Sequence, residues 1–236
     1  MKKKLRKDAQ ATRERLLAAA AEVFAEKGYW EATHAEICER AGTNTASVNY
    51  HFGSKENLYV EAWQHSHDES IRSHPPDGGV PPTAAPEERL YGRILAFMHR
   101  IADPDNHEIE IVHKEMANPT GLLMHAMHTT IESERQSTLA LVRELLGAKA
   151  SERAVCLCEM SLMSQCFGPM LHLRHRKMPP GMPRPPAPLA ELSVEQLADH
   201  IVQFTLAGIR GIRENLKNAK ASGTRRQPRK TASRRE

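Results

Sequence analysis

Apolar residues recur at helical spacing along most of the chain. Over residues 16–24 they return every three or four positions as one stripe, and charged residues lie outside it. No segment alternates with a period of two over a useful length, so we expect an all-α fold without a sheet. The pattern predicts further helices over residues 34–41, 45–51, 55–73, 87–103, 106–117, 119–146, 152–177 and 193–217.

Local signals mark the ends of these helices. Asn44 and Ser54 can cap the helices that follow them, and Gly28 can end the first helix. Pro119 suits the first turn of its helix, whereas Pro169 should kink the helix that contains it. Three pairs have the spacing of a capping box, in which two side chains satisfy exposed backbone donors reciprocally: Thr33 with Glu36, Asp105 with Glu108, and Ser193 with Gln196.

Proline marks the boundaries between the helical segments. Eleven of the fifteen prolines fall within residues 74–86 and 178–188, and neither stretch can be the interior of a helix. The resulting organisation is a basic N-terminal arm over 1–11, a helix-turn-helix domain over 12–73, a helical ligand-binding and dimerisation domain over 87–217, and a basic tail over 218–236.

The segment 33–52 has the pattern of a helix-turn-helix, with two short helices joined by a turn at Gly42. The second short helix can enter the major groove, where Asn49 could pair with adenine and the methyl group of Ala46 could contact thymine. Lys55 sits at the start of the next helix, where its charge and the exposed N–H groups both favour a phosphate. On spacing alone, an ordinary three-helix corner of an all-α protein also fits.

Three motifs in this region are characteristic of one family. The stretch TRERLLAAAAEVFAEKGY over residues 12–29, the spacing of Ile37 with Ala41 and Gly42, and TNTASVNYHFGSKENLY over 43–59 resemble the TetR family of one-component transcriptional regulators. The resemblance implies that Thr45, Ala46 and Asn49 face bases. It implies phosphate contacts for Thr33, Ser47, Tyr50, His51 and Lys55.

Two positions depart from the usual TetR pattern. Thr43 stands where a small aliphatic residue is usual, and Asn49 stands where a tyrosine is usual. The second departure implies an operator preference unlike that of the better-known relatives.

The C-terminal part is similar to a narrower group. Residues 112–120 (VHKEMANPT) and 208–212 (GIRGI) resemble regulators with a CecR-type C-terminal domain. Adaptable methionines suit an apolar effector pocket, although they suit a helical core equally. The candidate pocket residues are Met98, His113, Met116, Met127 and Met163, and the candidate dimer residues are Leu162, Phe167, Leu171, Val202, Phe204 and Ile209.

Charge is distributed unevenly along the chain. The net charge is +4, yet residues 1–7 carry five Lys or Arg and residues 217–236 carry eight against one Glu. Residues 8–73 hold six basic and eleven acidic residues, a poor balance for binding phosphates. We therefore expect the arm at Lys2–Lys7 to supply cations, in the adjacent minor groove as homeodomain arms do.

Other chemistries lack a matching pattern. Thirteen histidines and four cysteines show no spacing typical of a metal site, so neither a metal nor a cofactor is expected. No nucleotide loop or nucleophile motif is present, which argues against an enzyme. No apolar run is long enough for a membrane span and no secretion signal is visible, which favours the cytoplasm.

These patterns together predict a homodimer that binds a palindromic double-stranded DNA operator and leaves it when an unidentified small molecule binds. Two alternatives stay open, an activator of the same fold and an all-α scaffold that binds a partner protein.

Overall fold

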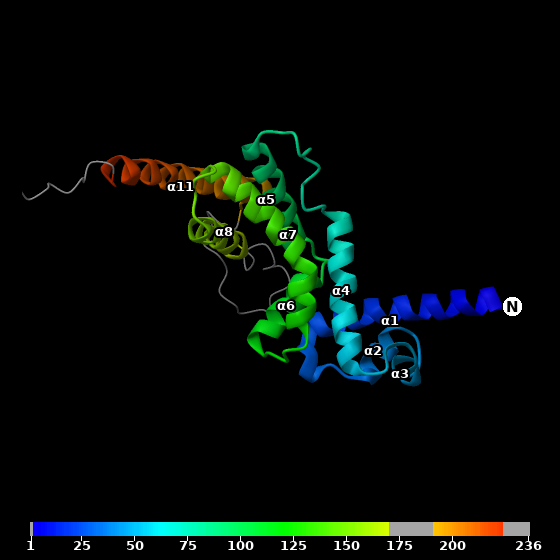
Figure 1. The fold of residues 1–236 in the computed structure, drawn as a ribbon. Coiled ribbons are helices and arrows are strands. Elements are labelled where there is room, and N and C mark those ends of the chain that lie inside the picture. Colours follow the sequence, from blue (N-terminus) through cyan, green and yellow to red (C-terminus); the bar gives the residue numbers. More distant parts are fainter. Residues whose placement is uncertain (1, 170–190, 224–236) are drawn as a thin grey trace, which may run out of the picture.

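The computed structural model describes residues 2–169 and 191–223, and every regular element within these ranges is an α-helix (Figure 1). This confirms the all-α fold predicted from the apolar spacing. The helices are α1 (Lys2–Glu31), α2 (His34–Arg40), α3 (Ala46–Phe52), α4 (Lys55–Ser73), α5 (Pro86–Ala102), α6 (Glu108–Ala117), α7 (Leu123–Leu146), α8 (Glu152–Phe167) and α11 (Val194–Gly223).

Helices α1 to α4 pack around one apolar cluster. Its fully buried side chains include Phe24 from α1, Ile37 from α2, Val48 from α3, and Tyr59 and Trp63 from α4. The ring of Phe24 meets that of Tyr59 edge-on, with 4.8 Å between the ring centres. This cluster fixes α2 and α3 against α1 and α4, and so decides which face of α3 is exposed.

A second apolar cluster joins α5, α7, α8 and α11 at the other end of the molecule (Figure 1). Helix α6 contributes to both clusters, because Ile111 packs into the first and Ile109 into the second. Helix α4 also contacts both α6 and α7. The predicted C-terminal domain therefore rests directly on the N-terminal helices.

The predicted N-terminal arm is the first part of α1. The backbone is helical from Lys2, so these residues continue the first helix, and their predicted contact with the minor groove stays a prediction. The reason is local, since no Gly or Pro precedes Gly28 and the segment is rich in good helix formers. Gly28 itself, at φ +76°, interrupts the helix, which resumes briefly to Glu31.

The start of α7 also differs from the prediction. Gly121 has a φ of +78°, which an α-helix does not accommodate. The backbone N–H groups of Thr120 and Gly121 donate to the carboxylate of Glu115, at 3.0 and 2.9 Å. Pro119 therefore precedes the helix instead of lying in its first turn.

The later helix ends give mixed outcomes. Helix α8 ends at Phe167, so Pro169 follows the helix and does not kink it, and residues 170–177 of that prediction lie outside the described residues. The capping box before α11 is confirmed, because Gln196 N–H donates to Ser193 Oγ at 3.2 Å and Ser193 N–H donates to Gln196 Oε1 at 2.9 Å. Helix α11 runs on to Gly223, into the predicted tail.

Candidate functional site

Helices α2 and α3 form the predicted helix-turn-helix. Thr33 Oγ1 accepts the N–H of Glu36 at 3.2 Å, but the Glu36 carboxylate pairs with Lys27 at 2.6 Å, so only half of that capping box forms. The turn passes through Gly42 at φ +63°. Asn44 Oδ1 accepts the N–H of Ser47 at 3.2 Å, which confirms that Asn44 caps α3.

Burial on one side of α3 leaves a polar face on the other. Val48 and Phe52 are buried in the first cluster, which turns Asn49 and Tyr50 outward, and Tyr50 is 79% exposed. Of the predicted DNA contacts, five are exposed and three are half-buried. The exposed residues are Thr33, Thr45, Ala46, Asn49 and Tyr50, and the half-buried residues are Ser47, His51 and Lys55.

Lys55 is held at the start of α4 beside the end of α3. Ser54 Oγ accepts the N–H of Asn57 at 3.2 Å and caps this helix, as the sequence predicted. The Lys55 ammonium lies 4.4 Å from the centre of the Tyr29 ring, a cation–π contact. Burial lowers the pKa of Lys55, and the Glu56 carboxylate opposes that shift. The cation is therefore oriented before any phosphate arrives.

Within residues 8–73, most cations other than Lys55 already have acidic partners. Arg40 donates to Glu26 at 3.0 Å and to Glu22 at 3.3 Å, and Arg13 is paired with Glu61. These pairs use charge that would otherwise neutralise phosphates. The first turns of α1 project beyond α2 and α3 (Figure 1).

A buried guanidinium connects this DNA-facing unit to the rest of the chain. Arg100 on α5 donates Nε to Ser70 Oγ on α4, Nη1 to Glu134 on α7, and Nη2 to both oxygens of Glu108 on α6, all at 2.9 Å. Asn106 Nδ2 donates to the same Ser70 Oγ at 2.8 Å. One side chain thus holds four helices together.

This network explains why one predicted capping box is absent. Glu108 N–H donates to Asn106 Oδ1 at 2.9 Å, and Asp105 N–H donates to Asp103 Oδ1 at 2.9 Å. The Glu108 carboxylate is engaged by Arg100 and cannot reach back to Asp105.

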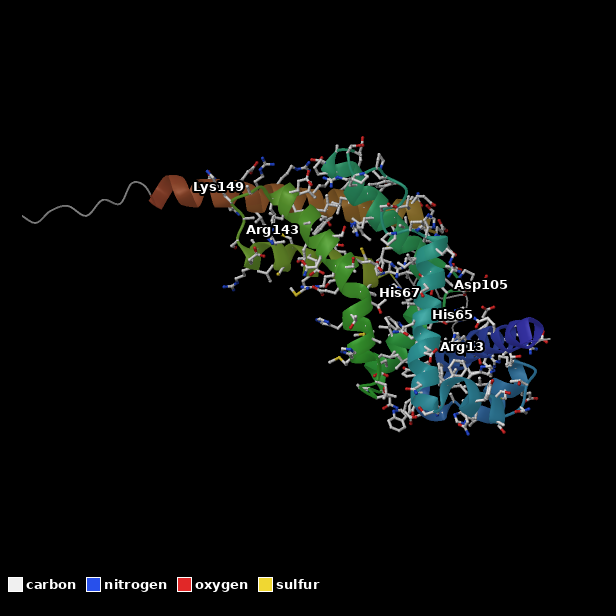
Figure 2. All side chains as sticks on the ribbon, turned by 45° about the vertical axis from the view of Figure 1, so that its right-hand side comes forward. Arg13, His65, His67, Asp105, Arg143 and Lys149 are labelled. Atoms are coloured by element: carbon white, nitrogen blue, oxygen red, sulfur yellow. The ribbon has the colours of Figure 1, made fainter. Side chains whose placement is uncertain are left out.

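His67 on α4 extends the network. Figure 2 shows it between Arg13 in the N-terminal lobe and Arg143 in the other lobe. Its Nε2 lies 3.1 Å from Glu134 Oε1 and 3.9 Å from Glu108 Oε1, and its Nδ1 lies 3.8 Å from Asp68. Burial opposes the charged imidazole, but these carboxylates outweigh burial and the Arg100 charge, so the pKa of His67 is raised.

An inner cavity of about 220 Å³ lies beside this network. Its walls come from α5, α6, α7 and α8 and are mostly apolar. Arg100, Glu108 and Glu134 form part of the lining, so the groups that hold α4 also face this space. The apolar wall residues are Ile94, Phe97, Ile109, Val112, Met127, Ile131, Leu162, Met163, Cys166 and Phe167.

The structure divides the predicted pocket residues. Met127 and Met163 line the inner cavity. Met98 is fully buried in the second apolar cluster instead, while His113 and Met116 are exposed on α6, with Met116 at 75%. Helical spacing had not indicated which face of α6 would meet α1 and which would meet solvent.

The predicted dimer residues are divided as well. Leu162, Val202 and Ile209 are buried within this chain's own second cluster. Phe167 is partly exposed and meets the ring of Phe97 edge-on. Phe204 is 62% exposed on α11. Leu171 lies outside the described residues.

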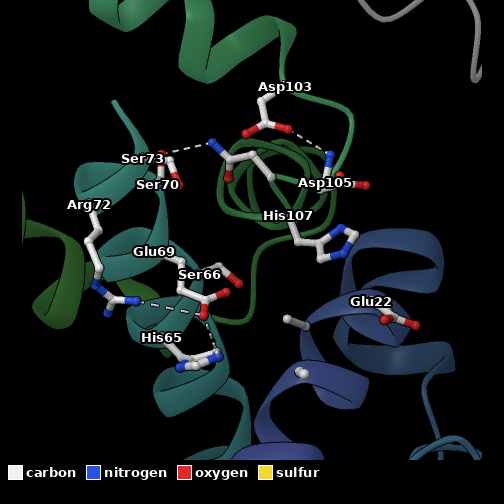
Figure 3. A pocket seen from close by; sticks show the side chains of 13 residues that line it. Glu22, His65, Ser66, Glu69, Ser70, Arg72, Ser73, Asp103, Asp105 and His107 are labelled. Carbon is white, nitrogen blue, oxygen red and sulfur yellow. Dashed lines mark hydrogen bonds and ion pairs between the residues drawn. The ribbon is translucent and has the colours of Figure 1, made fainter. Parts of the chain in front are cut away.

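A separate polar crevice of about 460 Å³ lies between α1, α4 and the loop 103–107 (Figure 3). Glu69 lies within it, 3.7 Å from His65 and 3.9 Å from Arg72. Within residues 2–169 and 191–223, no three His, Cys, Asp or Glu side chains are grouped so as to hold a metal. Nothing about the crevice therefore adds metal chemistry to the site.

The buried thiols are poor candidates for redox sensing. Burial raises the pKa of Cys38 and Cys158, and raises that of Cys166 to about 12. A thiol with a raised pKa carries little of the reactive thiolate near neutral pH.

In the part of the chain that the structure describes, no helix is long and apolar enough to cross a bilayer.

Two family models match the chain. The model for the C-terminal domain of the HTH-type transcriptional dual regulator CecR matches residues 86–209, which is more than half of the sequence, and the model for bacterial regulatory proteins of the tetR family matches residues 16–62. The chain belongs to the TetR family. It is a TetR-family DNA-binding transcriptional regulator with a CecR-type C-terminal domain.

Known TetR-family proteins resemble it along most of its length. The HTH-type transcriptional dual regulator CecR of Shigella flexneri is 28% identical over 167 residues, 66% of this chain and 74% of that protein. The regulator SrpR of Pseudomonas putida is 27% identical over 54% of this chain and 57% of its own length. A TetR-like regulator from Rhodococcus sp. RHA1 shares the fold, with a TM-score of 0.62 at 18% identity over 85% of this chain and 96% of its own.

The sequence did not reveal the Arg100 network of this TetR-family member. Its partners lie up to 34 positions away, beyond the reach of any local motif. One signal was present, because Arg93, Phe97 and Arg100 follow each other at intervals of four and three on α5 and so share one face. That charged face, which would ordinarily be read as solvated, lines the inner cavity.

Replacement of Asn49 by alanine should weaken specific DNA binding. Loss of a bidentate contact to a base costs about 1–3 kcal/mol and relaxes discrimination at that base pair. Fluorescence anisotropy with a selected duplex and its single-base variants would measure both effects. Asn118→Ala, which removes an exposed amide far from α3, is the matched control; equal losses in the two variants would contradict a base-reading role for Asn49.

The raised pKa of His67 predicts a pH-dependent stability. Between about pH 6.5, the unfolded value, and the raised folded value, the native state holds the extra proton, so the free energy of unfolding should fall as pH rises. Each pKa unit of difference contributes about 1.4 kcal/mol. Urea unfolding at about pH 6 and about pH 8 would measure the change.

The control for this test uses the same helix. His67→Gln should remove the fall in stability with rising pH. His65→Gln, which changes a residue in the polar crevice, should leave that fall unchanged. An identical pH profile for wild type and His67→Gln would show that His67 is not the group responsible.

Proposed function

We propose that this regulator is a ligand-responsive repressor that binds a palindromic operator as a homodimer and is released when a small molecule enters the inner cavity. The observation that carries the proposal is the double role of α4. Its first residue, Lys55, lies at the DNA-facing surface, and its last turns bond through Ser70 and His67 to Arg100 and Glu134 in the cavity wall.

The proposed mechanism is a shift between two conformers. A molecule in the cavity changes the surroundings of Arg100 and Glu134, and a change in their bonds to Ser70 and His67 moves α4. Movement of α4 displaces α3, because α3 and α4 pack together. Coupling of this kind is typically about 1–3 kcal/mol, enough to lower operator affinity several-fold to a hundredfold.

An exposed apolar surface on α8 and α11 supports the proposed homodimer. Leu157 and Met160 on α8 and Phe204 and Ile212 on α11 are 38 to 62% exposed, and the two helices pack together. At Gly208, an added Cβ would meet nothing within 4 Å, which leaves room for a partner helix to approach closely. Phe204 is a predicted dimer residue on this surface, whereas Leu157, Met160 and Ile212 were not predicted.

Selection from random duplexes tests the proposal. A dimeric repressor should enrich a palindrome whose half-sites are about 34 Å apart or a multiple of that distance, matching one turn of B-DNA. A scaffold that binds a partner protein should enrich no sequence. A promoter with the selected site placed over its start should then lose transcription when the protein is added.

Replacement of Phe204 by glutamate should separate the subunits. A carboxylate buried without a partner in the α11 surface should weaken the dimer about a hundredfold or more, and operator affinity should fall because one subunit reaches one half-site. Sedimentation velocity and anisotropy would measure the two effects. Met124→Glu, at an exposed methionine on α7, is the control; a Phe204→Glu protein that stays dimeric would exclude this surface as the interface.

Activation is the second candidate function, because the relative from Shigella flexneri is named a dual regulator. The same promoter assay distinguishes the two, since an activator would raise transcription from a site placed upstream of the start.

A further inference from the structure

We propose that the inner cavity binds a small amphipathic carboxylate, with its apolar body among the wall residues and its carboxylate on the guanidinium of Arg93. This inference rests on the proposed function, because it names the chemical class of the effector. It depends on an observation separate from the helix-turn-helix, namely a half-buried cation with a buried, unpartnered Nε and no acidic partner.

Arg93 lies on α5, in the cavity wall. Its Nη2 donates to Ser137 Oγ at 2.8 Å, and its Nη1 makes only a long contact of 3.4 Å with Thr138 Oγ1. Its Nε is buried and donates to no acceptor among the described residues. Two hydroxyl oxygens therefore stand where a guanidinium usually has a carboxylate.

The electrostatics of Arg93 agree with this geometry. Burial lowers the pKa of Arg93, and the more distant Glu134 and Asp77 compensate only in part. A buried cation without an adjacent anion is unfavourable, so an incoming carboxylate would restore a charge-assisted, two-point hydrogen bond. A neutral acceptor would gain a weaker hydrogen bond from this group, and a cationic ligand would be repelled by it.

The other charges around the cavity are already matched. Arg100 is held by Glu108 and Glu134, and Arg135 lies 3.7 Å from Glu159. Within the described ranges, Arg93 is the lining cation with no carboxylate within 4 Å. This difference singles out one end of the cavity as the place for an anion.

The size of the cavity limits the ligand. A volume of about 220 Å³ holds about seven heavy atoms if each needs roughly the 30 Å³ of a water molecule. The walls offer aliphatic and aromatic carbon and sulfur, including Ile94, Phe97 and Met127. A short aliphatic carboxylic acid fits both the room and the lining.

Arg93 also places such a ligand next to the groups that hold α4. Arg93 and Arg100 lie on the same face of α5, two turns apart. Glu134 lines the same cavity and bonds both Arg100 and His67. A second anion near Arg93 would repel Glu134 and weaken its hold on α4.

Calorimetric titration of the full chain with hexanoate, hexan-1-ol and hexylamine tests the headgroup. These probes are unbranched and have six carbon atoms each, so the main difference between them is the charge of the headgroup. Hexanoate should bind at least about tenfold more tightly than the alcohol, and hexylamine should not bind. Equal binding of the alcohol and the acid, preference for the amine, or no binding by any probe would overturn the proposal.

Two variants on one helix locate the anion. Arg93→Met should erase the preference for hexanoate over hexan-1-ol while the alcohol still binds. Arg89→Met, which removes a guanidinium paired with Glu144 outside the cavity lining, should keep the preference. Loss of the preference in both variants, or in neither, would contradict a role for Arg93. Thermal unfolding of each ligand-free variant checks that it is folded.

The operator assay separates this inference from the proposed function. If the protein binds a selected duplex but does not bind hexanoate more tightly than hexan-1-ol, the proposed repressor function is supported and the proposed carboxylate ligand is refuted. If hexanoate binds through Arg93 but the selection enriches no duplex, the proposed carboxylate ligand is supported and the proposed repressor function is refuted.

Discussion

The burial of one guanidinium is the constraint on which the arrangement of the two lobes depends. Arg100 is almost completely buried, and a cation in that position is tolerable only if its donors and charge are all matched. Glu108, Glu134 and Ser70 provide that match from three other helices. Removal of one carboxylate would leave a buried charge uncompensated, typically at about 3–5 kcal/mol, so α4, α5, α6 and α7 are held in a single relative position.

In the proposed mechanism, that position ties the binding of DNA to the state of the cavity. Helix α4 has 19 residues and spans about 28 Å, with Lys55 at one end and Ser70 near the other. A helix this short moves as a unit, so a change in its last turns reaches the start of the helix. The coupling needed for regulation, about 1–3 kcal/mol, is smaller than the cost of breaking the Arg100 network outright. The loss of only one of the bonds from Glu134 to His67 and Arg100 would therefore supply enough free energy for such coupling.

Features encoded within a few residues were predictable, and features that join distant segments were not. The helices, the Asn44 cap and the Ser193–Gln196 box follow from local spacing, and the sequence placed them correctly. The Asp105 box failed because Arg100, from another helix, competes for the same carboxylate. The methionines show the same limit, since periodicity identifies a helix face but the packing of neighbouring helices decides what that face meets.

The distribution of charge determines which parts of the N-terminal helices contribute to DNA affinity and which contribute to sequence specificity. Because Arg13, Lys27 and Arg40 are already paired with acids, residues 8–73 carry little free charge for phosphates. The basic start of α1 extends the first helix beyond the apolar cluster. Cations on such an extension act on the phosphate backbone, which has the same charge in every sequence. In the proposed function, discrimination between sequences therefore falls to the short polar face of α3.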